Sequence, residues 1–491
     1  MGGRTINGVE TADVVCVGAR VAGCATAIPL AREGRRVIAL DRARFPSNTL
    51  STHGMWPGTV AELKRLGALD RVLALDPPHI REMLVYHLGV TARDRARPID
   101  GIDYGLCVAR TDLDLALVET ARDAGVDVRE GASVTDLIWD GDRAAGVRYR
   151  TRDGATGEIR ARLVVGADGR RSTVAELVGA AVPYRGSRNE RGFAYWYLDD
   201  PKAGTSWRNV ASLWMVGRTH GLVMPMPRNR MVVAHMGPAD EIGRYRRDPA
   251  GMWERMLREQ RHLAERVRGA TRASRCYTAA ELPAFFRVSS GPGWALVGDA
   301  GHYKDPVIGQ GIRDSLEFGR RLGEAAASVL EDPRALDRAL RRWERDRDRA
   351  NIPAYHWANG QTRVDDPQPV FAEALREFAR RPHSLSDMFS RVRTPQQVVP
   401  PTLGTALLLR ALARPGADRR RIVRHWVEQS ATYNDVWLET ALARFRIRRH
   451  AASEIPGWRW PPEREARTEA ATPSANGGAP EREAAVVGGA E

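Results

Sequence analysis

The segment 298–312, GDAGHYKDPVIGQGI, combines residue types that bind hydroxyl and anionic groups. It follows a short apolar run, as the end of a buried strand would. Asp299 then stands at the strand's carboxyl end, where its carboxylate can accept hydrogen bonds from a polyol. Pro306 fixes the backbone, and a glycine pair at 309–311 opens a helical pattern. Backbone N–H groups at a helix start bind anions, so the segment can hold a ligand of mixed hydroxyl and anionic character.

A second glycine pair follows the first apolar run of the chain. The run ADVVCV at 12–17 predicts a strand buried on both faces, and GARVAG and a helical pattern come next. In G-x-G-x-x-G the first glycine makes a tight turn, the last lets helix and strand pack, and the helix start holds a pyrophosphate. Gly18 and Gly23 take these two places, and Asp41 has the spacing of an acid that binds ribose hydroxyls. Arg20 replaces the middle glycine, which weakens the match.

A third segment, GADGRRS at 166–172, also follows a buried strand. Its Asp-Gly pair alone indicates little, because this pair is common in turns. The other two segments also fit glycine-rich connections of an ordinary α/β protein that bind no ligand. No single segment therefore identifies a site.

The hydrophobic pattern predicts the elements that position these segments. The GARVAG segment at 18–23 lies in a strand–helix–strand unit that ends near residue 40. Further along the chain we predict an amphipathic helix over 111–124 with Thr111 as its N-cap, short strands over 126–165, aromatic strands at 193–198 and 211–216, one charged helix over 248–267, a long helix from 311 to about 330, and arginine-rich helices over 334–450.

Composition limits the classes of protein that fit. At 491 residues the chain has room for two or three domains, and 43% hydrophobic with 28% charged residues is typical of a globular protein. It has no membrane-span-length apolar run, no room for a signal peptide and no metal-binding cysteine spacing, so we expect a reduced, cytoplasmic protein without a metal. The net charge of +14 comes from arginine spread along the chain, so we do not expect nucleic-acid binding.

The three segments together resemble one protein family. A G-x-x-x-x-G helix start, GADG-x-x-S near 170 and GDAxH-x-x-x-P-x-x-G-x-G near 300 occur in this order. This looks like the FAD-dependent monooxygenases of the para-hydroxybenzoate hydroxylase fold and their geranylgeranyl reductase relatives, over roughly residues 10–345. The resemblance implies an α/β fold with a discontinuous Rossmann-type FAD-binding domain, a mostly antiparallel β-sheet substrate domain and a helical C-terminal region.

We place the domain boundaries from this resemblance and the composition. They are an FAD-binding domain at 10–80, 104–182 and 286–345, a substrate domain at 81–103 and 183–285, a helical region at 346–461, and a disordered tail at 462–491.

The resemblance also implies residues that bind FAD, each at a position that matches a family motif. They are Gly18, Arg20, Val21, Ala22 and Gly23 at the pyrophosphate, Asp41 and Arg42 at the adenosine, Arg110 on FAD, Val134 at the adenine, Asp168 for both FAD and NAD(P)H, Asp299 at the ribityl chain, and Pro306, Gly309, Gln310, Gly311 and Ile312 beside the flavin ring.

Family chemistry then implies a reaction. NAD(P)H reduces the flavin, O2 forms a flavin C4a-hydroperoxide, and one oxygen atom passes to an aromatic or polyketide-like small molecule. A reductase or dehydrogenase of the geranylgeranyl reductase type, acting on a C=C or C–C bond, is the main alternative, and a flavin-binding sensor is the non-enzyme alternative. A halogenase of this fold would need a lysine further along than Lys64. The oligomeric state is not indicated.

His53 and Lys304 are the main candidate catalytic groups. His53, in LSTHG, belongs to a segment whose family counterpart lies near the flavin ring, although a histidine hydrogen-bonded in a loop is the favoured interpretation. His302 and Tyr303 are weaker candidates. Lys304 is one of three lysines among 75 basic residues, and we expect it either to pair with Asp305 or steer an anionic group, or to be a solvated loop lysine. Tyrosines and tryptophans at 195–197 and 214 fit either a pocket or the sheet core.

Overall fold

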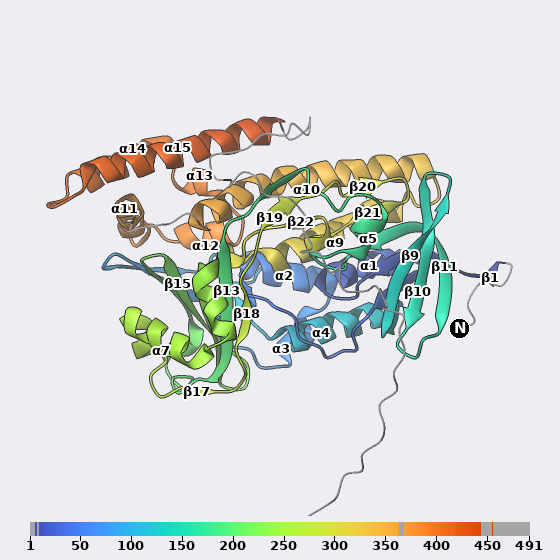
Figure 1. Ribbon diagram of the computed structural model, residues 1–491, viewed down its shortest axis with the longest axis horizontal. Coiled ribbons are helices and arrows are strands. Elements are labelled where there is room, and N and C mark those ends of the chain that lie inside the picture. Colours follow the sequence, from blue (N-terminus) through green and yellow to red (C-terminus); the bar gives the residue numbers. More distant parts are fainter. Residues whose placement is uncertain (1–4, 7–8, 363–367, 443–453, 455–491) are drawn as a thin grey trace, which may run out of the picture.

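The computed structural model describes residues 5–6, 9–362, 368–442 and 454 of the chain. Two large sheets lie side by side, one in the half that holds the N-terminus and one at the other end (Figure 1). The long helix α10 (Pro333–Thr362) runs from above the first sheet toward the second sheet, below the C-terminal helices. This is the predicted α/β architecture with a helical C-terminal region.

The first sheet has nine strands and contains the predicted strand–helix–strand unit. Its order is β20-β21-β11-β2-β3-β8, with β1 on β2 and with β10 and β9 continuing from β11. The alternate residues Val14 and Cys16 of β2 pack in one core cluster and Val15 and Val17 in another, so the strand is buried on both faces. The strands are β1 (Thr5–Ile6), β2 (Val9–Val17), β3 (Val37–Asp41), β8 (Asp127–Glu130), β9 (Ala132–Asp140), β10 (Arg143–Thr151), β11 (Thr156–Gly166), β20 (Ser290–Gly291) and β21 (Trp294–Leu296).

Glycines let two helices of this half pack backbone to backbone. A Cβ at Gly323 of α9 would lie 2.4 Å from the Thr26 carbonyl oxygen of α1, and one at Gly319 would lie 2.8 Å from Ala25 Cβ. Because α1 and α9 follow the parallel strands β2 and β21, both helices begin at the same edge of the sheet. The helices here are α1 (Val21–Arg32), α2 (Pro57–Leu66), α3 (Leu69–Leu73), α4 (Arg110–Asp123), α5 (Thr173–Leu177), η3 (Gly298–Ala300), η4 (Pro306–Ile308) and α9 (Gly311–Ala327).

The second sheet, of eight strands, separates an aromatic core from a methionine-rich face. Its order is β17-β13-β16-β15-β14-β5-β6, with β18 on β13. Trp196 and Trp214 pack on one face with residues of α7 and α8, whereas Tyr195, Met224 and Met236 lie on the other. Its elements are β5 (Glu82–His87), β6 (Val90–Arg95), β13 (Arg191–Asp199), η1 (Ser206–Asn209), β14 (Val210–Val216), β15 (Thr219–Met226), β16 (Arg230–Pro238), α6 (Ala239–Gly243), η2 (Arg244–Arg246), α7 (Pro249–Glu259), α8 (Arg261–Arg266), β17 (Thr271–Arg272) and β18 (Tyr277–Ala279).

Short sheets and the C-terminal helices connect the two halves. Arg185 of β12 donates to Glu439 of α15 at 2.7 Å, and His356 of α10 lies 2.8 Å from the same carboxylate, which fastens α15 to α10. The remaining elements are β4 (Gly54–Met55) with β7 (Leu106–Cys107), β12 (Arg185–Ser187) with β19 (Ala284–Phe286) and β22 (His302–Tyr303), and then α11 (Pro369–Phe378), α12 (Ser384–Phe389), α13 (Pro395–Val398), α14 (Pro401–Leu412) and α15 (Arg419–Leu442).

The domain boundaries stay a prediction. Strands β5 and β6 share a sheet with β13–β18, as the predicted grouping requires, but α10 runs without a break through the predicted boundary at residue 346. The predicted tail at 462–491 lies outside the described residues.

Two predictions of local structure are wrong. Thr111 is not an N-cap, because α4 begins at Arg110 after Ala109, and Arg110 pairs with Asp114 across the first helical turn. The predicted single helix over 248–267 is two helices. It breaks at Gln260, whose φ of −116° is not helical and whose buried Nε2 donates to Thr219 Oγ1 at 3.0 Å.

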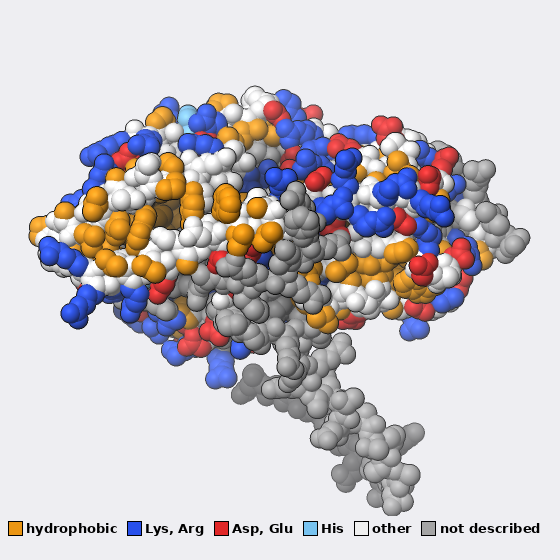
Figure 2. All heavy atoms as spheres, turned by 90° about the horizontal axis from the view of Figure 1, so that it is seen from above, with side chains coloured by type: hydrophobic (Ala, Val, Ile, Leu, Met, Phe, Trp, Pro, Cys, Tyr) orange, Lys and Arg blue, Asp and Glu red, His pale blue; other side chains and the backbone are white. Residues whose placement is uncertain are grey.

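The outer face of the C-terminal helices is partly apolar. Figure 2 shows hydrophobic side chains gathered over α14 and α15, and among them Leu409, Val427 and Trp437 are 61%, 60% and 71% exposed. Among the helices that the structure describes, none combines the length and hydrophobicity that a membrane crossing requires.

The tight turn at α1 gives the first test. A Cβ at Gly23 would lie 1.8 Å from the Gly18 carbonyl oxygen, so we expect Gly23→Ala to lower the free energy of unfolding by about 1–3 kcal/mol, the usual cost of overpacking. Gly204→Ala is the control, because a Cβ there meets nothing within 4 Å. Denaturant titration of both variants measures the difference, and equal stabilities would contradict the close packing.

Candidate active site

The GARVAG segment at 18–23 lies against the 166–172 segment at the carboxyl edge of the nine-stranded sheet. Gly18 has φ +102°, and a Cβ there would lie 2.5 Å from the Ala167 carbonyl oxygen. A Cβ at Gly23 would lie even closer to backbone, 1.8 Å from the Gly18 carbonyl oxygen. Asp41, at the end of β3, accepts a hydrogen bond from the Ala19 N–H at 2.9 Å. These contacts form a narrow backbone cradle at the start of α1, whose first N–H groups have no partner within the helix.

Two arginines beside this cradle share one buried carboxylate. The Arg20 side chain turns toward α4, where it donates to Ser47 Oγ at 2.7 Å and pairs with Asp114. Arg110 pairs with Asp114 at 2.8 Å. The Asp114 side chain is fully buried, and two guanidinium groups on one carboxylate leave a net positive charge near the start of α1. Sequence analysis missed Asp114, although its i,i+4 spacing from Arg110 signals the pair.

Three other predicted residues occupy separate elements. Asp168 accepts from Ser172 Oγ at 2.5 Å and from the Val174 N–H at 3.2 Å, so its carboxylate caps the start of α5. Burial raises the pKa of Asp168, although these hydrogen bonds oppose the change. Arg42 is exposed just after β3, and Val134 lies in β9. The cofactor roles of these three residues remain predictions.

The 298–312 segment packs against the start of α1, beside the other two segments. A Cβ at Gly298 would lie 2.8 Å from Ala22 Cβ in the first turn of α1. Burial raises the pKa of Asp299, and the positive charges of Arg170 and Arg110 oppose this change. The structure therefore brings all three glycine segments to one edge of the sheet, where the Asp299 carboxyl group feels the positive charges of Arg170 and Arg110.

The end of this segment forms a loop that starts α9. We call residues 306–311 the Pro–Gly loop. Gly309 has φ +59°, and a Cβ there would lie 3.7 Å from Thr52 Oγ1, so the loop lies against the segment that contains His53. Gln310 is the N-cap of α9, and its side chain makes no cap hydrogen bond. The backbone N–H groups of Gly311 and Ile312 in the first turn of α9 have no partner within the helix.

Two of the expectations for Lys304 are wrong, and the third, that it steers an anionic group, stays a prediction. Lys304 is only 7% exposed, so it is not a solvated loop lysine, and it does not pair with Asp305. Its Nζ pairs with Asp314 of α9 and donates to Asn351 Oδ1 of α10 at 2.7 Å. Burial lowers the pKa of Lys304 to about 8, although Asp314 opposes this change. Arg391 reaches the other oxygen of Asp314 at 3.3 Å, so two cations flank one carboxylate.

His53 lies in a buried aromatic cluster. Its Nε2 is 2.7 Å from the Tyr197 hydroxyl, and its ring stacks edge-on with Tyr195 at 4.9 Å. Burial, together with the positive charge of Arg110, lowers the pKa of His53 to about 3, so the imidazole is neutral. Its hydrogen bond agrees with the favoured interpretation of His53 as a hydrogen-bonded loop residue, and a catalytic role stays a prediction.

An apolar pocket lies between the Pro–Gly loop and the methionine-rich face of the second sheet. Its space is about 460 Å³, part of it open to solvent. None of the described residues that line it carries a charge. The lining residues are Thr52, Gly54, Trp56, Met83, Ala211, Ser212, Leu213, Leu222, Met224, Met236, Pro306, Val307, Ile308, Gly309 and Phe389. The predicted aromatic residues at 195–197 and 214 do not line it and belong to the core of the sheet.

Known proteins are similar to this chain in sequence and in fold. Residues 11–352 match a protein family described as FAD binding domain. A menaquinone reductase of Mycobacterium tuberculosis is 30% identical over 348 residues, which cover 67% of this chain and 78% of that protein. A rifampicin monooxygenase of Streptomyces venezuelae is 27% identical over 322 residues, which cover 65% of this chain and 64% of that protein.

Solved structures show the same fold at low sequence identity. A flavoprotein/dehydrogenase from Cytophaga hutchinsonii superposes with a TM-score of 0.70 at 19% identity, covering 82% of this chain and 99% of that one. The myxobacterial chondrochloren halogenase superposes with a TM-score of 0.68 at 20% identity, and the match covers 90% of this chain and 99% of that one. At these identities the likeness concerns the fold alone.

The buried position of Lys304 gives a stability test. Lys304→Met leaves the Asp314 carboxylate buried with Arg391 as its remaining cation, and we expect a loss of about 3 kcal/mol of folding free energy, the low end for breaking a buried pair. Lys64→Met, at an exposed lysine, is the control and should change stability by less than about 0.5 kcal/mol. Equal effects in a denaturant titration would show that Lys304 is solvated.

Asp305 gives a test of pH dependence. The residue is 3% exposed, Oδ1 accepts from the Val307 N–H at 3.0 Å, and burial raises the pKa of the carboxyl group to about 6. The folded protein therefore keeps this proton up to about pH 6, whereas the unfolded chain releases it near pH 4. The contribution of the Asp305 carboxyl group to the free energy of unfolding therefore falls as pH rises from about 4 through 6. The side chain of Asp305→Asn does not ionise, so the variant does not lose this stability as the pH rises.

The stability of Asp305→Asn relative to wild type should rise with pH by up to about 3 kcal/mol between pH 4 and 7. Denaturant titrations of both proteins across this range measure the difference. Asp76→Asn, at a surface carboxylate that pairs with Arg208, is the control. A difference between wild type and Asp305→Asn that does not change with pH would refute the raised pKa.

Proposed function

The chain belongs to the FAD binding domain family and is an FAD-dependent oxidoreductase, and we propose that it uses NAD(P)H and O2 to insert one oxygen atom into an uncharged, mostly apolar small molecule. The observation that carries the choice of substrate class is the apolar pocket beside the Pro–Gly loop, whose described lining residues bear no charge. FAD supplies the electron transfer and the oxygen chemistry when it is bound.

The residues of the three glycine segments fit FAD. The glycine contacts at Gly18 and Gly23 let the start of α1 approach a pyrophosphate, where free N–H groups and the helix dipole favour negative charge. Asp41 then stands at the ribose and Asp299 at the ribityl chain. The start of α9 at Gly311 offers a positive helix end to the flavin ring. These assignments are part of the proposal, supported by the position of every segment at one sheet edge.

The pocket residues orient the substrate and exclude water. Met83, Met224 and Met236 have flexible, polarisable side chains that adapt to an apolar surface. None of the described lining residues carries a charge that would hold water, so a bound ring displaces water from the face of the Pro–Gly loop. The Tyr197 hydroxyl donates a hydrogen bond to Nε2 of the neutral His53, which orients the His53 ring next to the lining residue Gly54.

A second candidate is reduction of a C=C bond or a quinone. It is favoured by the 30% identity to a menaquinone reductase over 348 residues, and a menaquinone reductase acts on an uncharged ring compound as its name states. Both candidates share the pocket and the cofactor.

One assay separates the candidates. Purified protein with bound flavin is mixed with NADH or NADPH and a neutral probe, 1-naphthol or 1,4-naphthoquinone, under ¹⁸O₂ or under nitrogen. Monooxygenation predicts an ¹⁸O-labelled product from 1-naphthol that forms only with oxygen. Reduction predicts anaerobic turnover of the quinone without label. A protein that neither purifies with FAD nor binds it on addition would contradict both candidates.

A further inference from the structure

The turn at residues 389–391 comes from the C-terminal helices, outside the range 11–352 that matches the family. It nevertheless touches the FAD-binding half by its backbone. Gln310 Nε2 donates to the Phe389 carbonyl oxygen at 2.9 Å, and a Cβ at Gly58 of α2 would lie 2.7 Å from the Ser390 carbonyl oxygen. Arg391 has φ +61°, a conformation that a residue with a side chain adopts only where its surroundings hold it.

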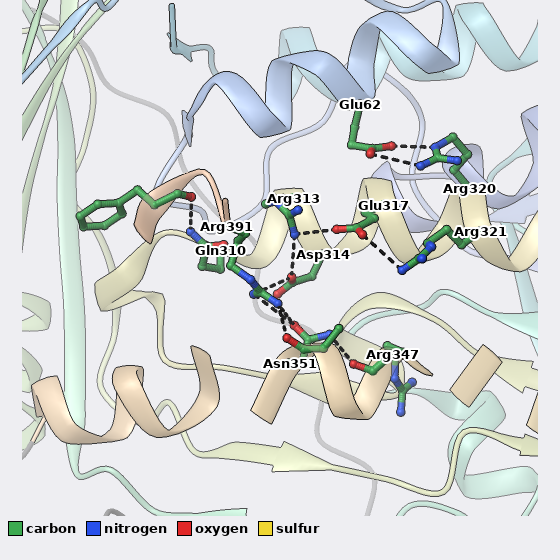
Figure 3. A network of polar contacts seen from close by, with 12 residues as sticks. Glu62, Gln310, Arg313, Asp314, Glu317, Arg320, Arg321, Arg347, Asn351 and Arg391 are labelled. Carbon is green, nitrogen blue, oxygen red and sulfur yellow. Dashed lines mark hydrogen bonds and ion pairs between the residues drawn. The ribbon is translucent and has the colours of Figure 1, made fainter. Parts of the chain in front are cut away.

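The Arg391 side chain fastens this turn to two helices. Its Nη1 donates to Asp314 Oδ1 in the first turn of α9 at 3.3 Å, and its Nη2 donates to the Ala350 carbonyl oxygen of α10 at 2.7 Å. Figure 3 shows Arg391 pointing at Asp314 and Asn351, close to Gln310 of the Pro–Gly loop. Lys304 holds the other Asp314 oxygen, so the network fixes the start of α9 and the turn as one unit.

Phe389 closes the apolar pocket on the side of the C-terminal helices. Its ring lies 5.4 Å from the Trp56 ring, which also lines the pocket, and 5.1 Å from the Trp357 ring of α10. The residue is 8% exposed. A large, rigid ring held between two indoles forms an end wall, whereas the methionine side chains on the sheet can adapt to a ligand.

We propose that Phe389 is a specificity-determining residue of the active site and that Arg391 is the positioning residue that holds it. The proposal rests on the proposed function, because it assigns the apolar pocket to the substrate. The size of the side chain at position 389 then limits how long a substituent on the substrate ring fits. The C-terminal helices thereby belong to the catalytic unit of this chain rather than to an accessory domain.

A series of 1,4-naphthoquinones with 2-alkyl chains from methyl to hexyl tests the wall. Dissociation constants come from the absorbance change of the bound flavin, which requires no turnover. Wild type should bind the hexyl probe more weakly than the methyl probe. Phe389→Ala should raise the affinity for hexyl relative to methyl at least tenfold. Phe378→Ala, which removes an equal volume from a buried site of α11 that does not line the pocket, should keep the wild-type ratio.

Phe389→Leu is the second variant, because it removes less volume and keeps the protein foldable if Phe389→Ala does not fold. It should shift the ratio in the same direction by a smaller factor. An unchanged ratio in either folded variant overturns the proposal. A wild type that binds FAD but none of the probes contradicts the proposed substrate class instead, so the two failures are distinct.

Arg391→Gln tests the positioning role. Loss of the guanidinium frees the turn, so the preference for the methyl probe over the hexyl probe should fall toward unity while FAD remains bound. Arg391→Lys should restore most of the preference. Arg393→Gln is the matched control, because Arg393 pairs with Asp387, which Arg97 also holds, and it makes no contact with the Pro–Gly loop. A wild-type preference in Arg391→Gln would overturn this role.

Discussion

One buried carboxylate, Asp314, connects the parts of this protein on which its site depends. It sits in the first turn of α9 and is flanked by Lys304 from the 298–312 segment and Arg391 from the C-terminal helices. Burial raises the pKa of Asp314, but the cations Lys304 and Arg391 outweigh it and hold the pKa below its usual range. Because an unpaired buried charge is costly, the three elements can only be assembled together.

The candidate active site lies where the nine-stranded and the eight-stranded sheets meet. The nine-stranded sheet brings the starts of α1 and α9 to one edge, because both helices follow parallel strands and pack through glycines. In the proposed function, that edge offers backbone N–H groups and the carboxylates of Asp41 and Asp299 to the cofactor. The eight-stranded sheet turns its methionine-rich face toward the same edge, where none of the described lining residues of the pocket carries a charge. In the proposed function, an apolar substrate meets the flavin ring there.

Much of this arrangement could be predicted from the sequence, because its signals are local. Continuous apolar runs predicted the parallel strands, and glycine spacing located the cradle at Gly18 and Gly23. Contacts between distant residues could not be predicted. Lys304 pairs with Asp314 and Asn351 across two helices rather than with its neighbour Asp305, and Phe389 reaches the pocket from a region that no motif covers. The break at Gln260 depends on its buried bond to Thr219, which periodicity does not reveal.

The central claim is that this FAD-dependent oxidoreductase binds an uncharged substrate in the apolar pocket. Comparing the dissociation constants of 1-naphthol and the 1-hydroxy-2-naphthoate anion, followed by the absorbance of the bound flavin, tests it most directly. No cation lines the described pocket to pair with a carboxylate, and burying an unpaired carboxylate costs several kcal/mol. We expect 1-naphthol to bind at least about tenfold more tightly, which corresponds to about 1.4 kcal/mol. Equal or tighter binding of the anion would contradict the claim.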